Sequence, residues 1–305
     1  MKIFVVGSIN MDLVINSSVE PKSGETIKGN SFFMNPGGKG ANQAFAASLM
    51  GANTYMIGTV GIPFGDELIN NLKNNNVNTK FVNFNNSLSS GVAVISVVNG
   101  ENKIIIDEGA NNSLSIENIK NALKESRPKD LIVLQNEIPI EIIEATILIA
   151  HKLNLTILYN PAPSVEVDFD LFQYIDFFIP NQHETKFYTG IYPKNHLDAQ
   201  RAANKLFDLG LKKVLITMGL YGSILYEKDK NYIFMPSVKT NIIDTTAAGD
   251  TYIGVFAAML SKGKDVNVAM NYATYAAALS ISKKGAQQSI PTIKEVERFI
   301  ENAKK

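Results

Sequence analysis

A short stretch near the C-terminal end of the chain, residues 244–250, has the composition of an anion-binding turn. It begins and ends with the carboxylates Asp244 and Asp250, and only Thr, Ala and Gly residues lie between them. Large apolar side chains recur beyond it at 252, 255, 256, 259 and 260, the spacing of a buried helix face. Small residues before a helix leave backbone N–H groups exposed at its positive end, which attracts an anion. Asp250 then lies beside the anion as a base or, alternatively, only caps the helix.

Two polar residues, Asn10 and Asp12, follow the first apolar run of the chain, which spans residues 3–9. A dinucleotide-binding turn would need glycines where Ile9 and Asp12 stand, so that motif is excluded. Ligands of open α/β sheets bind at the carboxyl ends of strands. A carboxylate there accepts hydrogen bonds from neighbouring hydroxyls and suits a sugar, although an Asx-type turn would explain the same residues.

A glycine-rich segment, residues 35–44, precedes a predicted helix of small residues at 45–51. It is not a phosphate-binding Walker A loop, because Phe33 occupies the position of the first glycine and Gly40 follows the lysine. Glycines let the backbone approach a ligand closely. Lys39 and Asn42 could therefore hold sugar hydroxyls, and the alternative is a tight turn with a solvated lysine.

Composition excludes several classes of function. The 305 residues include 29 basic and 29 acidic ones, and this balance argues against a nucleic-acid or membrane-surface role. The chain has no cysteine, which excludes disulfides and thiolate metal sites, and its three histidines lack metal-ligand spacing. Neither a signal peptide nor an apolar run long enough to span a bilayer is recognisable, so we expect a soluble, cytoplasmic protein.

The order of apolar segments predicts an α/β fold with a doubly wound, mainly parallel sheet and helices on both faces. Strands and helices alternate after Asn111, with strands at 131–134, 155–159, 174–179 and 213–217 and helices at 140–152 and 197–209. Two segments, about 12–35 and 91–108, show strand patterns with no helix between them, and Asn99-Gly100 suits a hairpin turn. We expect one domain, residues 1–305, with these segments inserted as a small β-sheet lid.

Polar residues at the other strand ends complete a set that fits phosphoryl transfer. Glu137, Asn181 and Glu184 could hold a hydrated Mg²⁺, although each could also be a helix cap. The loop at 217–222 could border a nucleotide, or could be a plain strand-to-hairpin turn. Phosphoryl transfer depends mainly on positioning and charge stabilisation, which such groups provide.

Four motifs in this order resemble the ribokinase family of carbohydrate kinases. They are residues 7–12, 37–44, 180–184 and 244–251, and the similarity extends to the tail at 284–289. The resemblance implies ATP-dependent phosphorylation of D-ribose at O5, with Asp250 as the base. It assigns the anion hole to the amides of Ala247, Ala248 and Gly249. The residues implied to bind the sugar are Asn10, Met11, Asp12, Gly38, Lys39, Gly40, Ala41, Asn42, Glu137 and Asp250.

The resemblance also implies ATP, Mg²⁺ and K⁺ sites and a homodimer formed through the lid. Glu184 would act on the Mg²⁺ side. The residues implied to contact ATP are Asn181, Glu184, Thr217, Met218, Gly219, Leu220, Tyr221, Gly222, Gly249, Asp250 and Thr274. Those implied to bind the monovalent cation are Asp244, Thr246, Ser280, Lys283, Gly285 and Ser289.

Two alternatives to a ribose kinase stay open. The first is a kinase for 2-deoxyribose or another small sugar or nucleoside. The second is a sugar- or nucleotide-binding protein without catalysis, against which Asp250 argues, because binding alone needs no base beside an anion site.

Overall fold

A computed structural model describes residues 1–98 and 101–303 of the chain. The body is built on a nine-stranded sheet in this part of the chain, ordered β13-β12-β11-β10-β9-β8-β1-β4-β5. Strand pairs are parallel from β5 to β11, and the pairs β11–β12 and β12–β13 are antiparallel. The strands are β1 (Lys2–Val6), β4 (Asn53–Gly61), β5 (Asn78–Asn85), β8 (Leu131–Leu134), β9 (Thr156–Tyr159), β10 (Phe177–Phe178), β11 (Lys213–Thr217), β12 (Ser223–Glu227) and β13 (Ile233–Met235).

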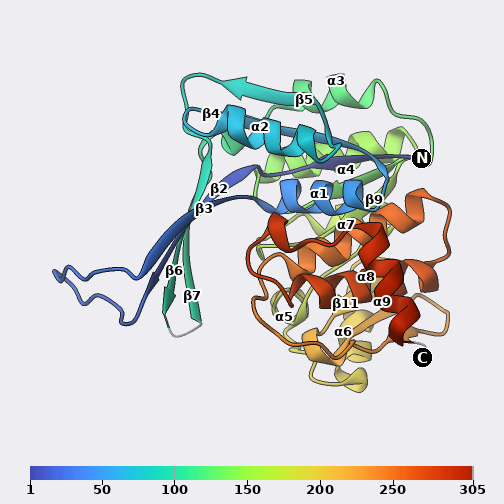
Figure 1. The fold of residues 1–305 in the computed structure, drawn as a ribbon. Coiled ribbons are helices and arrows are strands. Elements are labelled where there is room, and N and C mark those ends of the chain that lie inside the picture. The colour runs from blue at the N-terminus through green and yellow to red at the C-terminus, as the bar shows by residue number, and fades with distance from the viewer. Residues whose placement is uncertain (99–100, 304–305) are drawn as a thin grey trace.

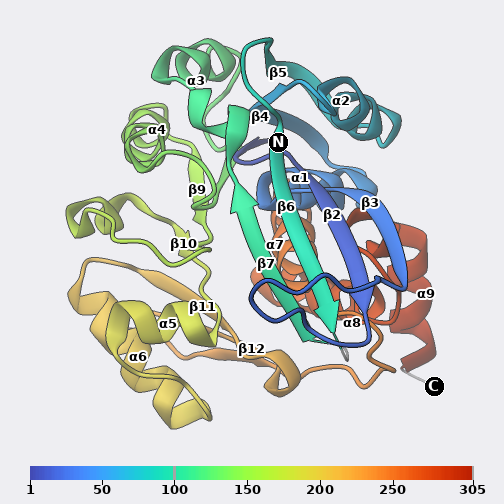
Figure 2. The same cartoon turned by 90° about the vertical axis from the view of Figure 1, so that its left-hand side faces the viewer.

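Helices cover both faces of this sheet, as predicted (Figure 2). In β1, Ile3 and Val5 pack into one core while Phe4 and Val6 pack into the other, because successive side chains of a strand point to opposite faces. The first face carries α1 (Lys39–Leu49), α2 (Gly65–Asn74), α7 (Ala248–Ser261), α8 (Val266–Ser280) and α9 (Ile293–Ala303). The second carries α3 (Ile116–Leu123), α4 (Ile140–Lys152), α5 (Gln182–Thr189) and α6 (His196–Asp208). Within residues 1–98 and 101–303, no helix is long and apolar enough to cross a membrane.

A second sheet of four strands, ordered β3-β2-β6-β7, projects from the body (Figure 1). We call β2 (Asn10–Ser17), β3 (Ser31–Gly37), β6 (Gly91–Val98) and β7 (Glu101–Asp107) the small sheet. It joins the two segments predicted to form an inserted sheet, because β2 pairs with β3 and with β6. The predicted hairpin turn at Asn99-Gly100 lies outside the described residues.

Two predicted elements have different boundaries in the structure. The helix predicted at 45–51 spans Lys39–Leu49, so residues 39–44 of the glycine-rich segment are helical, while residues 35–37 end β3. Its polar residues Asn42 and Gln43 are buried and hydrogen-bonded, which allows the helix to start earlier. The strand predicted at 174–179 is reduced to Phe177–Phe178. There the Asp176 carboxylate accepts the Ile157 amide, which shortens the regular ladder.

Candidate active site

The carboxyl ends of β1, β8, β10 and β11 meet at one edge of the large sheet. Ser8 and Asn10 follow β1, and Glu137 follows β8. Asn181 follows β10 and forms a parallel bridge with Thr217 at the end of β11. The fold therefore brings together polar residues that are far apart in sequence, as expected for an open α/β sheet.

Close backbone packing places α1 against the turn between β1 and β2. Gly38 has φ of 88°, and a Cβ atom on it would lie 2.8 Å from the Asn10 amide nitrogen. A Cβ atom on Gly40 would lie 2.7 Å from the carbonyl carbon of Gly7. Both positions therefore require glycine. The contact also lets the Lys39 amide donate to the Glu137 carboxylate at 3.1 Å.

Four buried carboxylates, those of Asp12, Glu137, Glu184 and Asp250, interact electrostatically with the Lys39 side chain. Burial raises the pKa of Asp12 to about 7, with further contributions from Glu137 and Asp250, while Lys39 partly opposes the shift. Burial alone would lower the pKa of Lys39, but Asp250, Glu137 and other carboxylates outweigh it and raise that pKa. Lys39 therefore stays charged and partly balances the acids.

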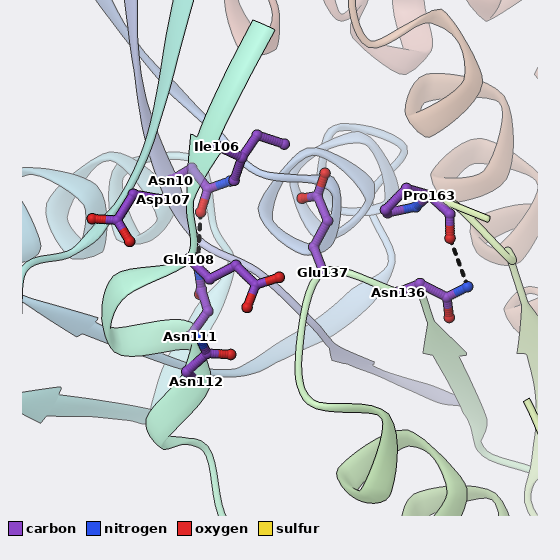
Figure 3. A pocket seen from close by; sticks show the side chains of 9 residues that line it. All are labelled: Asn10, Ile106, Asp107, Glu108, Asn111, Asn112, Asn136, Glu137 and Pro163. Carbon is purple, nitrogen blue, oxygen red and sulfur yellow. Dashed lines mark hydrogen bonds between the residues drawn. The ribbon is translucent and has the colours of Figure 1, made fainter. Parts of the chain in front are cut away.

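A pocket of about 440 Å³ lies between the small sheet and the body (Figure 3). Glu137 lies between Asn10 on one side and Pro163 on the other. The lining residues are Asn10, Ile106, Asp107, Glu108, Asn111, Asn112, Asn136, Glu137 and Pro163. Of these, only Asn10 and Glu137 are among the residues predicted from the sequence.

Asn111 is a buried pocket residue that the sequence did not reveal. Its side-chain amide donates to Asn10 Oδ1 at 2.7 Å, and its own oxygen accepts the Ile9 amide at 3.0 Å. This pair orients the Asn10 side chain. No motif surrounds Asn111, and only pairing of the small sheet brings the segment after β7 beside β2.

The start of α7 presents backbone amides beside Asp250. Ala247 is the N-cap residue, with φ of 58°, and a Cβ atom on Gly249 would meet nothing within 4 Å. In the described part of the chain, the amides of Ala247 and Gly249 donate to no protein group. The Ala248 amide differs, since it donates to the Thr245 carbonyl at 3.3 Å. Two of the three amides implied for the anion hole are therefore available to a ligand in this structure.

Asp250 is buried and does not cap the helix, so the capping alternative is wrong. Its two carboxylate oxygens accept the side-chain amides of Asn42 and Gln43, both at 3.0 Å. The carboxylate is thus held beside the open amides of α7.

The residues predicted to contact a nucleotide, apart from Gly249 and Asp250, come from α5, from β11 with the turn after it, and from α8. Asn181 caps α5, and the Glu184 carboxylate accepts the Asn181 backbone amide at 2.7 Å. Burial raises the pKa of Glu184 to about 7, although the Asn181 amide opposes this. Thr217 ends β11, and residues 218–222 form a turn whose Leu220 and Tyr221 side chains are exposed. Thr274 is buried on α8.

The segments predicted to bind a monovalent cation lie side by side. The amides of Ile243 and Asp244 donate to the Ile281 carbonyl at 2.8 and 3.2 Å. Burial opposes ionisation of Asp244, but hydrogen bonds from Thr246 and the Gly285 amide outweigh it and lower its pKa. The ionised carboxylate and nearby backbone carbonyls are hard oxygen donors, which suits such a cation.

The other predicted cation ligands contribute unequally. The Lys283 ammonium binds Glu295 at 2.9 Å, which leaves only its carbonyl for a cation. The Ser280 and Ser289 hydroxyls donate to carbonyls of the preceding turns, at 2.9 and 2.8 Å. Among the described residues, no group of three or more His, Cys, Asp or Glu side chains could hold a metal ion.

The model of the pfkB family carbohydrate kinases matches residues 1–293, which include every predicted site residue. The chain belongs to this family of carbohydrate kinases. Ribokinase from Bacillus subtilis is 36% identical over 299 residues, covering 98% of this chain and 99% of that protein. Deoxyribokinase from Salmonella typhi is 37% identical, with the same two coverages.

Solved structures of ribokinases share the fold. The structure of Arabidopsis thaliana ribokinase complexed with ribose and ATP is 30% identical, with a TM-score of 0.88 and 98% of each chain covered. The expectation of a doubly wound sheet carrying a second, smaller sheet is confirmed.

Proposed function

We propose that this pfkB-family kinase transfers the γ-phosphoryl group of ATP to O5 of D-ribose, giving ribose 5-phosphate and ADP. The observation that carries the proposal is the position of Asp250, which is buried beside the open amides of Ala247 and Gly249. The similarity to ribokinases, one of them complexed with ribose and ATP, supports this choice of substrates.

Each part of the site has a role in this reaction. Asn10, Asp12 and Glu137 would form hydrogen bonds with ribose hydroxyls. The first turn of α1 would contribute further hydrogen bonds to the sugar. Asp250 takes the proton of the primary hydroxyl while that oxygen forms a bond to the γ-phosphorus and the bond to the bridging β–γ oxygen breaks. The free α7 amides stabilise the charge on the transferred group.

Metal ions would support the nucleotide side of the site. Mg²⁺ would neutralise phosphate charge on the side of Glu184, a buried carboxylate that suits it through water. K⁺ would lie behind the start of α7, held by Asp244, Thr246, Ser280, Lys283, Gly285 and Ser289, several of them through backbone carbonyls. Replacing K⁺ by a bulky organic cation should lower kcat, and unchanged rates would reject the K⁺ site.

The small sheet would act as the lid of a single domain, residues 1–305, and as a dimer interface. Asn10 on β2 and Ile106 on β7 both line the pocket, so the sheet contributes directly to it. The strand registers place five exposed apolar side chains on its opposite face, and we call them the lid patch: Ile15, Phe32, Met34, Val94 and Ile105. An exposed apolar surface of this kind marks an interaction site.

A coupled assay of ADP release across a panel of sugars tests the proposed function. D-Ribose should give the highest kcat/KM. The 37% identity to a deoxyribokinase makes 2-deoxy-D-ribose the second candidate. Asp250→Asn should lower kcat by about 10²–10⁴-fold, the contribution of a positioned base. ADP release by no sugar would favour a binding protein instead, and full turnover by Asp250→Asn would refute the role of the base.

A further inference from the structure

A chain of buried amide side chains ends on the carboxylate of Asp250. Gln43 Nε2 donates both to Asp250 Oδ1 at 3.0 Å and to Asn160 Oδ1 at 3.2 Å, while Gln43 Oε1 accepts from Gln135 Nε2 at 2.6 Å. Gln43 and Gln135 are fully buried. Gln43 therefore uses both of its N–H groups and its oxygen within the protein.

Asp250 and Asn160, the two acceptors that face the Gln43 nitrogen, allow only one orientation of the Gln43 amide. An ionised carboxylate at Asp250 only accepts hydrogen bonds, so the nitrogen of Gln43 must face it. Asn160 Nδ2 donates to the Ile179 carbonyl at 3.0 Å, so the oxygen of Asn160 must face Gln43. A flipped Gln43 would direct its oxygen at two acceptors and its nitrogen at a donor.

An unsatisfied atom shows how strongly this orientation is imposed. Gln135 Oε1 is buried and has no hydrogen-bond partner among the described residues. Rotating the Gln135 amide would place its oxygen against the oxygen of Gln43, so the unpaired atom stays at the end of the chain. The network thus leaves its one unsatisfied atom at Gln135 and keeps the Gln43 nitrogen directed toward Asp250.

The second oxygen of Asp250 is held in the same way. Asn42 Nδ2 donates to it, and Asn42 Oδ1 accepts from Gln287 Nε2 at 3.2 Å. Asn42 is also expected to contact the sugar. Gln43 differs, because it is fully buried behind Asp250 and reaches the reacting groups only through that carboxylate.

We infer that Gln43 is a positioning residue that orients Asp250 and stabilises its ionised form, with Asn160 and Gln135 fixing its amide. This inference rests on the proposed function of Asp250 as the base. A hydrogen bond to a charged group contributes roughly a 10- to 100-fold effect. Gln43 therefore affects the proton transfer step more than sugar binding.

The test compares Gln43→Leu with Thr146→Val. Thr146 is also fully buried, and its hydroxyl donates to the Ile142 carbonyl in α4, remote from the site. Gln43→Leu should lower kcat roughly 10- to 100-fold with little change in the KM for ribose. The acid limb of its kcat–pH profile should move up by about 1 pH unit, because the carboxylate loses a donor and holds its proton more tightly. Thr146→Val should keep the wild-type kcat and pH profile.

A second variant covers the case in which Gln43→Leu does not fold. Gln43→Glu keeps the size of the side chain but adds a carboxyl group beside Asp250, so its kcat should fall most at high pH, where both groups are ionised. A wild-type pH profile in either folded variant would overturn the role of Gln43. If the Gln43 variants keep the wild-type pH profile while Asp250→Asn is inactive, Asp250 is still the base and only the inference about Gln43 fails. Active Asp250→Asn would instead refute the proposed function of Asp250.

Discussion

The Ser8 hydroxyl donates to the Glu137 carboxylate over 2.6 Å, joining the ends of β1 and β8 across 129 positions of sequence. The same carboxylate oxygen accepts the Lys39 amide at 3.1 Å. Glu137 is thus held by both the β1 end and the first turn of α1. The second carboxylate oxygen of Glu137 accepts neither of these hydrogen bonds, but its position is fixed by them.

Removing the charge of Glu137 should weaken sugar binding. Glu137→Gln keeps the shape of the side chain but replaces a charged acceptor for sugar hydroxyls, so the KM for ribose should rise about 10- to 100-fold. Initial rates at saturating ATP measure this. Glu141→Gln, an exposed position in the first turn of α4, is the control and should bind ribose normally. An unchanged KM in Glu137→Gln would remove Glu137 from the sugar site.

The raised pKa of Asp12 predicts a pH-dependent stability. Because this pKa is about 7 in the folded protein and 3.8 in the reference state, the folded state binds more protons between these values. The free energy of unfolding contributed by Asp12 therefore falls as pH rises through this window. Asp12→Asn lacks this titration, so its stability relative to wild type should increase from pH 5 to pH 8, by a few kcal/mol.

Urea unfolding of ligand-free protein at several pH values measures the effect of Asp12→Asn. The exposed Asp208 provides the control, and Asp208→Asn should differ from wild type by the same amount at each pH. A pH-independent difference for Asp12→Asn would contradict the raised pKa.

Loss of the α5 cap should affect both stability and ATP binding. Asn181 Oδ1 accepts the amides of His183 and Glu184 at 2.8 and 2.9 Å. Asn181→Ala should cost about 1 kcal/mol of unfolding free energy, as for other helix N-caps, and raise the KM for ATP. Asn195→Ala removes the equivalent cap of α6, where the Asn195 side chain accepts the Asp198 backbone amide. This matched variant should lose similar stability while its KM for ATP stays constant, and equal KM values in both variants would exclude Asn181 from the nucleotide site.

A charge in the lid patch should disrupt the proposed dimer. Ile105, on the edge strand β7, is 75% exposed, so Ile105→Lys would place an ammonium group in an apolar interface. Analytical ultracentrifugation should show monomers for this variant and dimers for wild type. Leu197→Lys, at a 70% exposed position on α6, should remain dimeric. A monomeric wild-type protein would refute the interface.

Local sequence determined the type of fold and most of the proposed active-site residues. Alternating strands and helices indicated the parallel sheet, because periodicity and strand ends are properties of short segments. The glycines at 38 and 40 and the small residues before Asp250 were recognisable for the same reason. Their roles toward sugar and ATP remain predictions.

Only the tertiary structure decided how these segments support one another. Gln43 and Asp250 are 207 positions apart, and nothing in the sequence near either residue indicates their hydrogen bond. The early start of α1 depends on that bond, because buried amides are stable in a helix only when they have partners. Asn111 likewise reaches Asn10 only when β2 and β6 pair. Hydrogen bonds between distant segments depend on the three-dimensional packing of the chain, which local patterns do not encode.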